Sequence, residues 1–109
     1  MDKNVLKKKL ENKKIILTKH FLEKASVRGI DPNYVENLLK TLEKFVTAIV
    51  QEEKENEIKL ELLFEKSRKY DLRAIISIKE KKKCINIITA HIQNKKRRKR
   101  LEKWLRKLR

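Results

Sequence analysis

Between residues 45 and 90 the apolar side chains recur at every second position, and this alternation constrains the fold more than any other feature. In IKLELLFE at 58–65, apolar residues hold the even positions, and charged residues hold 59, 61 and 65. Side chains of a β-strand point alternately to opposite faces, so this pattern predicts a strand with one buried face. The segments 45–51, 72–78 and 84–90 are predicted as further strands, separated by polar turns such as EEKENE and KEKKK.

Upstream of residue 44 the pattern indicates helices. Thr18 offers an N-cap for a helix over KHFLEKASVR, and Gly29 suits the left-handed position just past its end. Asp31 caps a second helix, with Pro32 in its first turn. The spacing of one apolar stripe supports this second helix. The stripe consists of Val35, Leu38, Leu39 and Leu42.

Three further segments complete the pattern. A short strand is predicted at 15–17, a weakly patterned helix at 3–13, and an amphipathic helix at 94–109. The predicted fold class is α+β, with two or three N-terminal helices packed on one face of a three- to four-stranded antiparallel sheet, plus a basic C-terminal helix. A chain of 109 residues is too short for two domains of typical size, so we expect a single domain over 1–109.

The charge of the chain is strongly unbalanced. Thirty-one Lys and Arg residues against fifteen Asp and Glu give a formal net charge of +16. Such an excess attracts polyanions, of which RNA and DNA are the obvious ones, whereas a membrane surface or an acidic protein is the weaker alternative. The single Cys84 suits a reducing compartment, and no apolar stretch approaches the length of a membrane span. We therefore expect a cytoplasmic protein that does not insert into a membrane.

The firmest charge signal is the run KKRRKR at 95–100. Cations at the start of a helix oppose the helix dipole unless phosphate neutralises them. The run therefore predicts polyanion binding, and a charged face that is merely solvated is the alternative. The residues predicted to contact nucleic acid are Lys95, Lys96, Arg97, Arg98, Lys99, Arg100 and Arg68.

Two histidines are candidates for acid–base chemistry. Metal-independent RNA cleavage needs a base for the 2′-hydroxyl, an acid for the leaving oxygen and cations for the charged transition state. His20 and His91 both lie beside predicted strand ends, and imidazole titrates near neutral pH. Arg28 and Arg73 are candidates for the phosphate clamp. The competing interpretation is structural, with His20 at a helix start and His91 at an exposed strand end.

Metal and cofactor sites find little support in the sequence. Cys84, His20 and His91 supply all the thiol and imidazole ligands, and no CxxC or HxxxH spacing joins them. Gly29 is the one glycine, which excludes glycine-rich phosphate loops. We expect no metal and no cofactor.

The order of elements resembles a known family. A histidine soon after a short strand, a helix ending in RGI, a second helix and an antiparallel meander are similar to small RelE-like toxins of the barnase–colicin–RelE group of ribonuclease folds. The resemblance lies in TKHFLEKASVRGIDPNYVENLL, LRAIISI and INIITAH, and spans about residues 15–92. It implies RNA as the target, metal-independent cleavage as the candidate chemistry, and an acidic antitoxin as a partner.

When the family pattern is compared with this sequence position by position, three of the candidate site residues match it. His20 and Arg28 fall on the family's histidine and RGI arginine, and Arg73 resembles its sheet arginine. His91 has no secure equivalent, and the basic C-terminal helix is an addition to the family pattern. The sequence thus predicts an RNA-binding RelE-like protein, with endoribonuclease activity as the candidate chemistry. The alternatives are a non-catalytic accessory protein that docks on RNA or DNA, and one half of a pair with an acidic partner.

Overall fold

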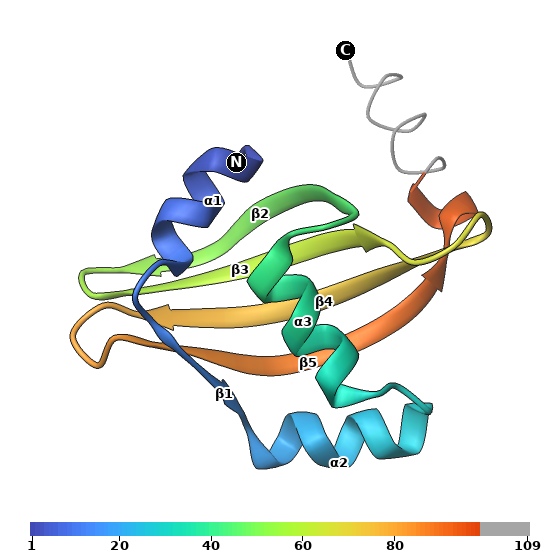
Figure 1. Ribbon diagram of the computed structural model, residues 1–109, viewed down its shortest axis with the longest axis horizontal. Coiled ribbons are helices and arrows are strands. Elements are labelled where there is room, and N and C mark those ends of the chain that lie inside the picture. The colour runs from blue at the N-terminus through green and yellow to red at the C-terminus, as the bar shows by residue number, and fades with distance from the viewer. Residues whose placement is uncertain (99–109) are drawn as a thin grey trace.

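The described part of the chain forms a mixed sheet with helices α1 to α3 around it (Figure 1). The structure is a computed structural model that describes residues 1–98. A helical turn at residues 95–98 follows the last strand, and the rest of the predicted C-terminal helix lies outside the described residues. In chain order, the elements are α1 (Lys3–Leu10), β1 (Lys14–Leu17), α2 (Lys19–Arg28), α3 (Pro32–Thr41), β2 (Phe45–Lys54), β3 (Glu57–Glu65), β4 (Tyr70–Lys79) and β5 (Cys84–Asn94).

The sheet has five strands in the order β1-β5-β4-β3-β2. Strands β2 to β5 form the predicted antiparallel meander. The prediction of a three- to four-stranded, purely antiparallel sheet was wrong, because β1 joins the meander parallel to β5, from Lys14 opposite Cys84 to Leu17 opposite Ile87. An apolar run of this kind predicts a strand but not its partner. Here the unpaired outer edge of β5 supplies that partner.

The predicted caps of α2 and α3 are confirmed. The Thr18 hydroxyl accepts a hydrogen bond from the Phe21 amide at 3.2 Å and donates one to the Ile87 carbonyl at 2.8 Å, so it both begins α2 and ties that helix to β5. Gly29 ends α2 in the left-handed region at φ 68°. The Asp31 carboxylate accepts from the Asn33 amide at 2.9 Å and begins α3.

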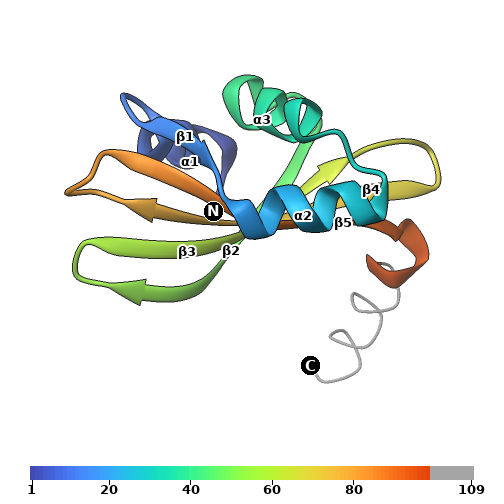
Figure 2. The same ribbon diagram turned by 90° about the horizontal axis from the view of Figure 1, so that it is seen from below.

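The helices surround the sheet unequally. Helices α1 and α3 lie over one face, whereas α2 runs beside β5 next to the end of β1 (Figure 2). The core lies between the sheet and the helices, and it includes the even positions of β3 that the alternation predicted to be buried. We call the opposite face of the sheet the outer face. Its residues come from the remaining positions of each strand, and they include the charged and polar groups considered next.

Candidate nucleic-acid interface

The outer face brings together two candidates from neighbouring strands. Arg73 on β4 is directly opposite His91 on β5 in the antiparallel register. The neighbouring pair, Ala74 and Ala90, is buried in the core, so alternation turns Arg73 and His91 to the outer face. Both side chains are half-buried. The imidazole therefore sits beside a guanidinium in a partly dehydrated environment.

A second guanidinium reaches this place from the end of α2. Arg28 donates from Nη1 to the Thr89 hydroxyl at 2.9 Å and to the Ala90 carbonyl at 3.0 Å. Thr89 and Ala90 immediately precede His91 in β5, so these two bonds hold Arg28 next to the histidine. Because α2 is tied to β5 through its N-cap Thr18 as well as through its last residue, the position of Arg28 follows from the packing of the whole helix.

A third guanidinium comes from the helical turn after β5. The Asn94 side chain accepts from the Lys96 amide at 2.9 Å, which begins the turn. Arg98 holds the turn to the sheet through Asp71, with Nε 3.2 Å from Oδ2 and Nη2 3.3 Å from Oδ1. This anchoring places Arg97 close enough for its charge to act on His91.

The electrostatic result is a neutral imidazole among cations. Partial burial lowers the pKa of His91 below its usual 6.5, and the charges of Arg28, Arg73 and Arg97 lower it further. His91 is therefore mainly unprotonated at neutral pH, and its free ring nitrogen is able to accept a proton. An anion entering the site would meet three guanidinium groups.

Glu61 is a site residue that the sequence did not single out. Its carboxylate forms an ion pair with Arg73 and accepts a hydrogen bond from the Gln51 side-chain amide at 3.2 Å. Arg73 is thereby held between an acidic group on β3 and the imidazole on β5. The alternation in β3 had placed Glu61 on the polar face, which was a correct but weak signal, because a charged residue on that face is usually only solvated.

The other residues that the sequence predicted for the site lie outside the group formed by His91 and its neighbouring arginines, or take part in other contacts. His20 is exposed near the start of α2, eight positions before Arg28 and therefore about 12 Å away along the helix axis, so it is not part of the cluster. Arg68 is exposed in the β3–β4 turn. Lys95 is half-buried, and its ammonium pairs with Glu65 at 3.0 Å. In the basic run, Lys96 and Arg97 are exposed, whereas Lys99 and Arg100 lie outside the described residues.

Metal-ligating residues are not clustered within residues 1–98. No group of three or more His, Cys, Asp or Glu side chains in this range is arranged to hold an ion. Cys84 is buried at the opposite end of β5 from His91. Within the same range, no helix has the length and apolar character needed to cross a membrane.

Comparison of the chain with family models, with curated proteins and with solved structures found no match in any of the three. The resemblance to RelE-like toxins thus stays a prediction from the sequence. The function has to be argued from the site itself.

The lowered pKa of His91 can be measured directly. In an NMR titration, with signals assigned by comparison with His91→Gln, we expect the imidazole of His91 to titrate with a midpoint below 6.5. Adding inorganic phosphate should raise this midpoint, because the bound anion offsets the three guanidinium charges. Folding disfavours the protonated form, so the contribution of His91 to stability is complete above pH 6.5 and declines as the pH falls through the folded-state pKa. A midpoint at or above 6.5 would contradict the arrangement.

Proposed function

We propose that this chain is an RNA-binding protein of the RelE-like kind that cleaves RNA without a metal ion at the outer face of its sheet. One observation carries the proposal. His91 lies opposite Arg73 in the sheet and beside Arg28, which is bound to Thr89 and Ala90, and burial together with the charges of Arg28, Arg73 and Arg97 lowers its pKa. A proton acceptor beside a cluster of guanidinium groups is the combination that phosphodiester cleavage requires.

The proposed reaction uses the substrate's own 2′-hydroxyl. His91 removes the proton from that hydroxyl, and the 2′-oxygen attacks the adjacent phosphorus. The phosphorus–O5′ bond breaks, which leaves a 2′,3′-cyclic phosphate on one fragment. The leaving 5′-oxygen takes a proton from water and becomes a 5′-hydroxyl on the other fragment, and the hydroxide formed takes the proton from His91 and restores the neutral imidazole. The three arginines bind the non-bridging oxygens and stabilise the additional negative charge of the phosphorane. DNA lacks the 2′-hydroxyl, so the reaction is restricted to RNA.

Glu61 has a positioning role in this scheme. Arg73 lies between Glu61 and His91, and its ion pair with the carboxylate limits the directions in which the guanidinium can point. A fixed guanidinium loses less side-chain entropy when it binds phosphate. The carboxylate also reduces the mutual repulsion among the three arginines when the site is empty.

A non-catalytic RNA-binding protein is the second candidate. The observation that favours it is the position of His20, which lies at the far end of α2 from the cluster and so supplies no second imidazole for the leaving oxygen. In this case the same arginines bind phosphate groups and no bond is broken.

Incubation of the purified protein with RNA in EDTA separates the two candidates. The proposal expects fragments with 2′,3′-cyclic phosphate ends, and no fragments from DNA of the same sequence. A salt-sensitive shift of intact RNA would support the second candidate. The absence of both cleavage and binding would contradict each of them.

Arg28→Gln tests the phosphate clamp. Removing one phosphate contact is expected to weaken RNA binding and to reduce the slope of log affinity against log salt by about 0.7 to 0.9. Lys24→Gln is the matched control, because Lys24 is exposed on the same helix and removes the same charge. Filter binding at several salt concentrations measures both slopes. Equal effects of the two substitutions would mean that Arg28 acts only through net charge.

A further inference from the structure

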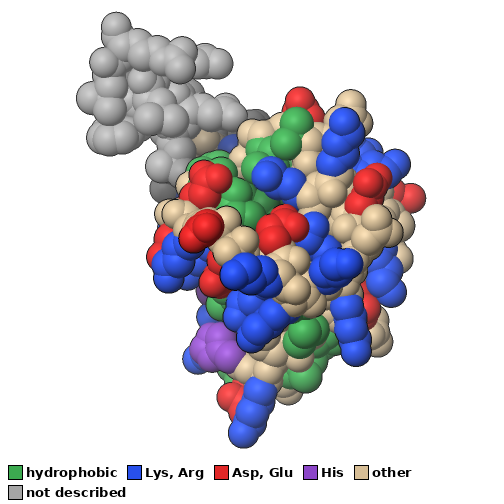
Figure 3. All heavy atoms as spheres, turned by 90° about the vertical axis from the view of Figure 1, so that its left-hand side faces the viewer, with side chains coloured by type: hydrophobic (Ala, Val, Ile, Leu, Met, Phe, Trp, Pro, Cys, Tyr) green, Lys and Arg blue, Asp and Glu red, His purple; other side chains and the backbone are tan. Residues whose placement is uncertain are grey.

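Positive charge alone does not show where an RNA strand lies on this protein. Viewed from the end that carries the β2–β3 and β4–β5 turns, Lys and Arg side chains are spread over the surface with acidic groups among them (Figure 3). A polyanion would be attracted to this surface as well as to the arginines around His91. A specific site for RNA needs a further feature that recognises bases, and such a feature lies at the opposite end of the sheet.

A pocket of about 310 Å³ opens at that opposite end, where the connection between α2 and α3 lies beside the β3–β4 turn and the end of β5 (Figure 1). Ile30 and Leu72 line it and are no more than 5% exposed, so the floor of the pocket is apolar and belongs to the core. Tyr34 of α3 and Ile92 of β5 also line it. We call it the tyrosine pocket, after Tyr34.

The tyrosine pocket adjoins the residues of the proposed reaction centre. One of its lining residues, Gly29, directly follows Arg28 in the chain. Another, Ile92, directly follows His91. The Arg28 guanidinium is bound to the Ala90 carbonyl, and Ile92 lies two residues further along the same strand, a step of about 7 Å. Strand β1 pairs with the first part of β5 alone, so within residues 1–98 no strand separates the guanidinium from the pocket.

The chemistry of the lining matches a nucleobase, which is flat and apolar on its faces and carries hydrogen-bonding groups along its edges. Tyr34 is half-buried and Ile92 is 37% exposed, so a ring and an aliphatic surface are available to the faces of a base. Asp31 and Lys66 are exposed, and they supply a carboxylate acceptor and an ammonium donor for its edges. Unpaired bases in RNA are recognised by this combination of stacking and edge contacts.

A second tyrosine extends this surface beyond the pocket. Tyr70 begins β4 on the same face as Leu72, is the diagonal neighbour of Ile92 across the two strands, and is 44% exposed. The preceding turn fixes its backbone. The amides of Lys66 and Ser67 donate to the Tyr70 carbonyl at 3.1 and 3.0 Å, and the Tyr70 amide donates to the Ser67 hydroxyl at 3.2 Å. A residue held in this way loses little freedom when a base stacks on its ring.

The turn before Tyr70 is cationic and contains no acidic residue. Residues 66–69 read KSRK, and all four are exposed. None of the three cations forms an ion pair within residues 1–98. Glu65 and Asp71, the acidic residues on either side of the turn, already have ion-pair partners after β5. The cations of this turn are therefore available to phosphate groups.

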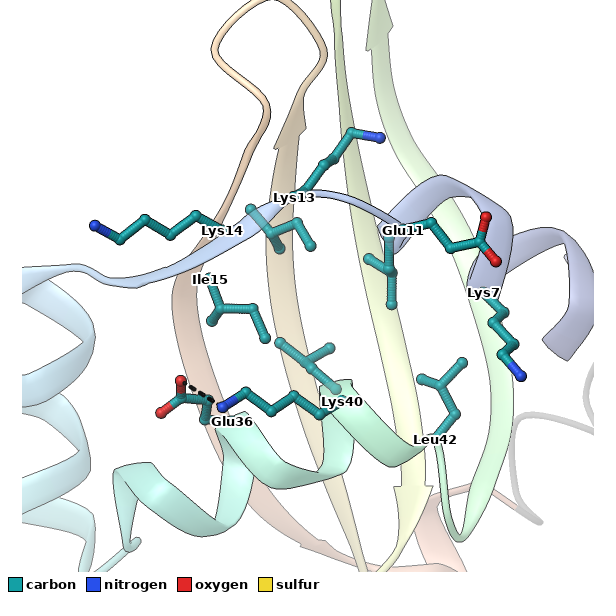
Figure 4. A pocket seen from close by; sticks show the side chains of 11 residues that line it. Lys7, Glu11, Lys13, Lys14, Ile15, Glu36, Lys40 and Leu42 are labelled. Atoms are coloured by element: carbon teal, nitrogen blue, oxygen red, sulfur yellow. Dashed lines mark ion pairs between the residues drawn. The ribbon is translucent and has the colours of Figure 1, made fainter.

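The larger pocket between α1, β1 and α3 lacks these features (Figure 4). Its volume is about 530 Å³, but its lining contains no aromatic ring, and the Lys7 and Lys14 ammonium groups point away from it. Ile85, its lining residue from β5, lies six positions before His91 and therefore about 20 Å away along the strand. A base bound there would be remote from the proposed reaction centre.

We propose that the tyrosine pocket binds one unpaired base of single-stranded RNA, that Tyr70 stacks on a neighbouring base, and that the 66–69 turn contacts their phosphate groups. This inference rests on the proposed function, in which Arg28 binds the phosphate at the cleaved bond. It goes further by naming the substrate class, an RNA whose bases are unpaired. Within a duplex, the edges and faces of a base are already in contact with other bases.

Fluorescence anisotropy with a labelled 2′-O-methyl RNA oligonucleotide of mixed sequence tests the proposal. The methyl group blocks attack by the 2′-oxygen, so binding is measured separately from cleavage. The strand is used alone and annealed to its complement. We expect the wild type to bind the single strand about fivefold or more tightly than the duplex, because the duplex cannot offer a base to either tyrosine.

Variants of the two tyrosines locate this preference. Tyr70→Leu and Tyr34→Leu each remove a ring and keep an apolar side chain. Each is expected to weaken single-strand binding roughly fivefold to a hundredfold and to leave duplex binding nearly unchanged. Tyr70→Phe keeps the ring and should bind as the wild type does. Val5→Ala is the matched control, because Val5 is a comparably exposed apolar residue on α1, outside the pocket, and should have no effect.

The outcomes separate this inference from the function on which it rests. Equal affinity of the wild type for single strand and duplex would overturn the inference alone, and so would full single-strand affinity of Tyr70→Leu. The reaction at His91 is then still judged by the cleavage experiment. Absence of binding to both forms would overturn the proposed function as well. Tyr34 packs partly against the core, so circular dichroism must show that its variant is folded, whereas the exposed Tyr70 gives a test that does not depend on core packing.

Discussion

Arg98→Met is expected to lower the free energy of unfolding by roughly 2 to 3 kcal/mol. Asp71 on β4 is fully buried, and both of its carboxylate oxygens lie near the Arg98 guanidinium. Removing the arginine leaves a buried negative charge with no ion-pair partner among residues 1–98, which costs more than the net value of the original pair. Urea denaturation followed by circular dichroism measures the loss.

Two further variants make this prediction specific. Arg97→Met removes the same charge from the neighbouring exposed position and should change stability by no more than about 0.5 kcal/mol. The double variant Asp71→Asn/Arg98→Met removes both charges and should recover most of the lost stability. Equal losses for the Arg98 and Arg97 variants, or a double variant as unstable as Arg98→Met, would show that the buried carboxylate does not depend on this pair.

His91→Ala is expected to reduce RNA cleavage by about 10²- to 10⁴-fold, while RNA binding is largely retained. In the proposed reaction the imidazole takes the proton of the 2′-hydroxyl, whereas the arginines supply the binding. Cleavage by the wild type should rise with pH until His91 is unprotonated and then level off. Because partial burial and the nearby cations lower the pKa of His91, the midpoint of this rise in kcat/KM should lie below pH 6.5.

The other histidine provides the control for this experiment. His20→Ala changes an exposed residue at the start of α2 and should leave cleavage nearly unchanged. Rates and gel shifts are measured on the same preparations, so loss of folding can be told apart from loss of chemistry. If cleavage depends on His20 and not on His91, the reaction centre lies at the start of α2 and the outer-face site is wrong.

Helix caps and apolar alternation predicted the helices and strands well, because each of these sequence patterns depends on a few neighbouring residues. The caps at Thr18 and Asp31, the glycine at position 29 and the alternation in β3 all predicted what the structure shows. The parallel pairing of β1 with β5 was not predictable in this way. Its partner segments are far apart in sequence, and four apolar or basic residues carry no information about which strand they will join.

The sequence also did not predict that the site residues lie close together. Arg28, Arg73 and His91 were each predicted as candidates, but their proximity depends on strand register and on how α2 packs against β5. The basic run shows the opposite problem. Its cations all suggested contacts to nucleic acid, yet Lys95 and Arg98 make ion pairs with Glu65 and Asp71 that anchor the turn to the sheet. Charge content predicts attraction to polyanions but does not show which cations already have internal partners.

The position of β5 between β1 and β4 has a consequence for synthesis of the protein on the ribosome. Within residues 1–98, β1 pairs in the sheet with β5 alone, and Arg28 at the end of α2 is held by Thr89 and Ala90 of the same strand. These N-terminal parts leave the ribosome early and wait for a strand that emerges much later. Until then the arginines and the histidine are not assembled. The nascent chain therefore brings Arg28, Arg73 and His91 together only after β5 is free to pair.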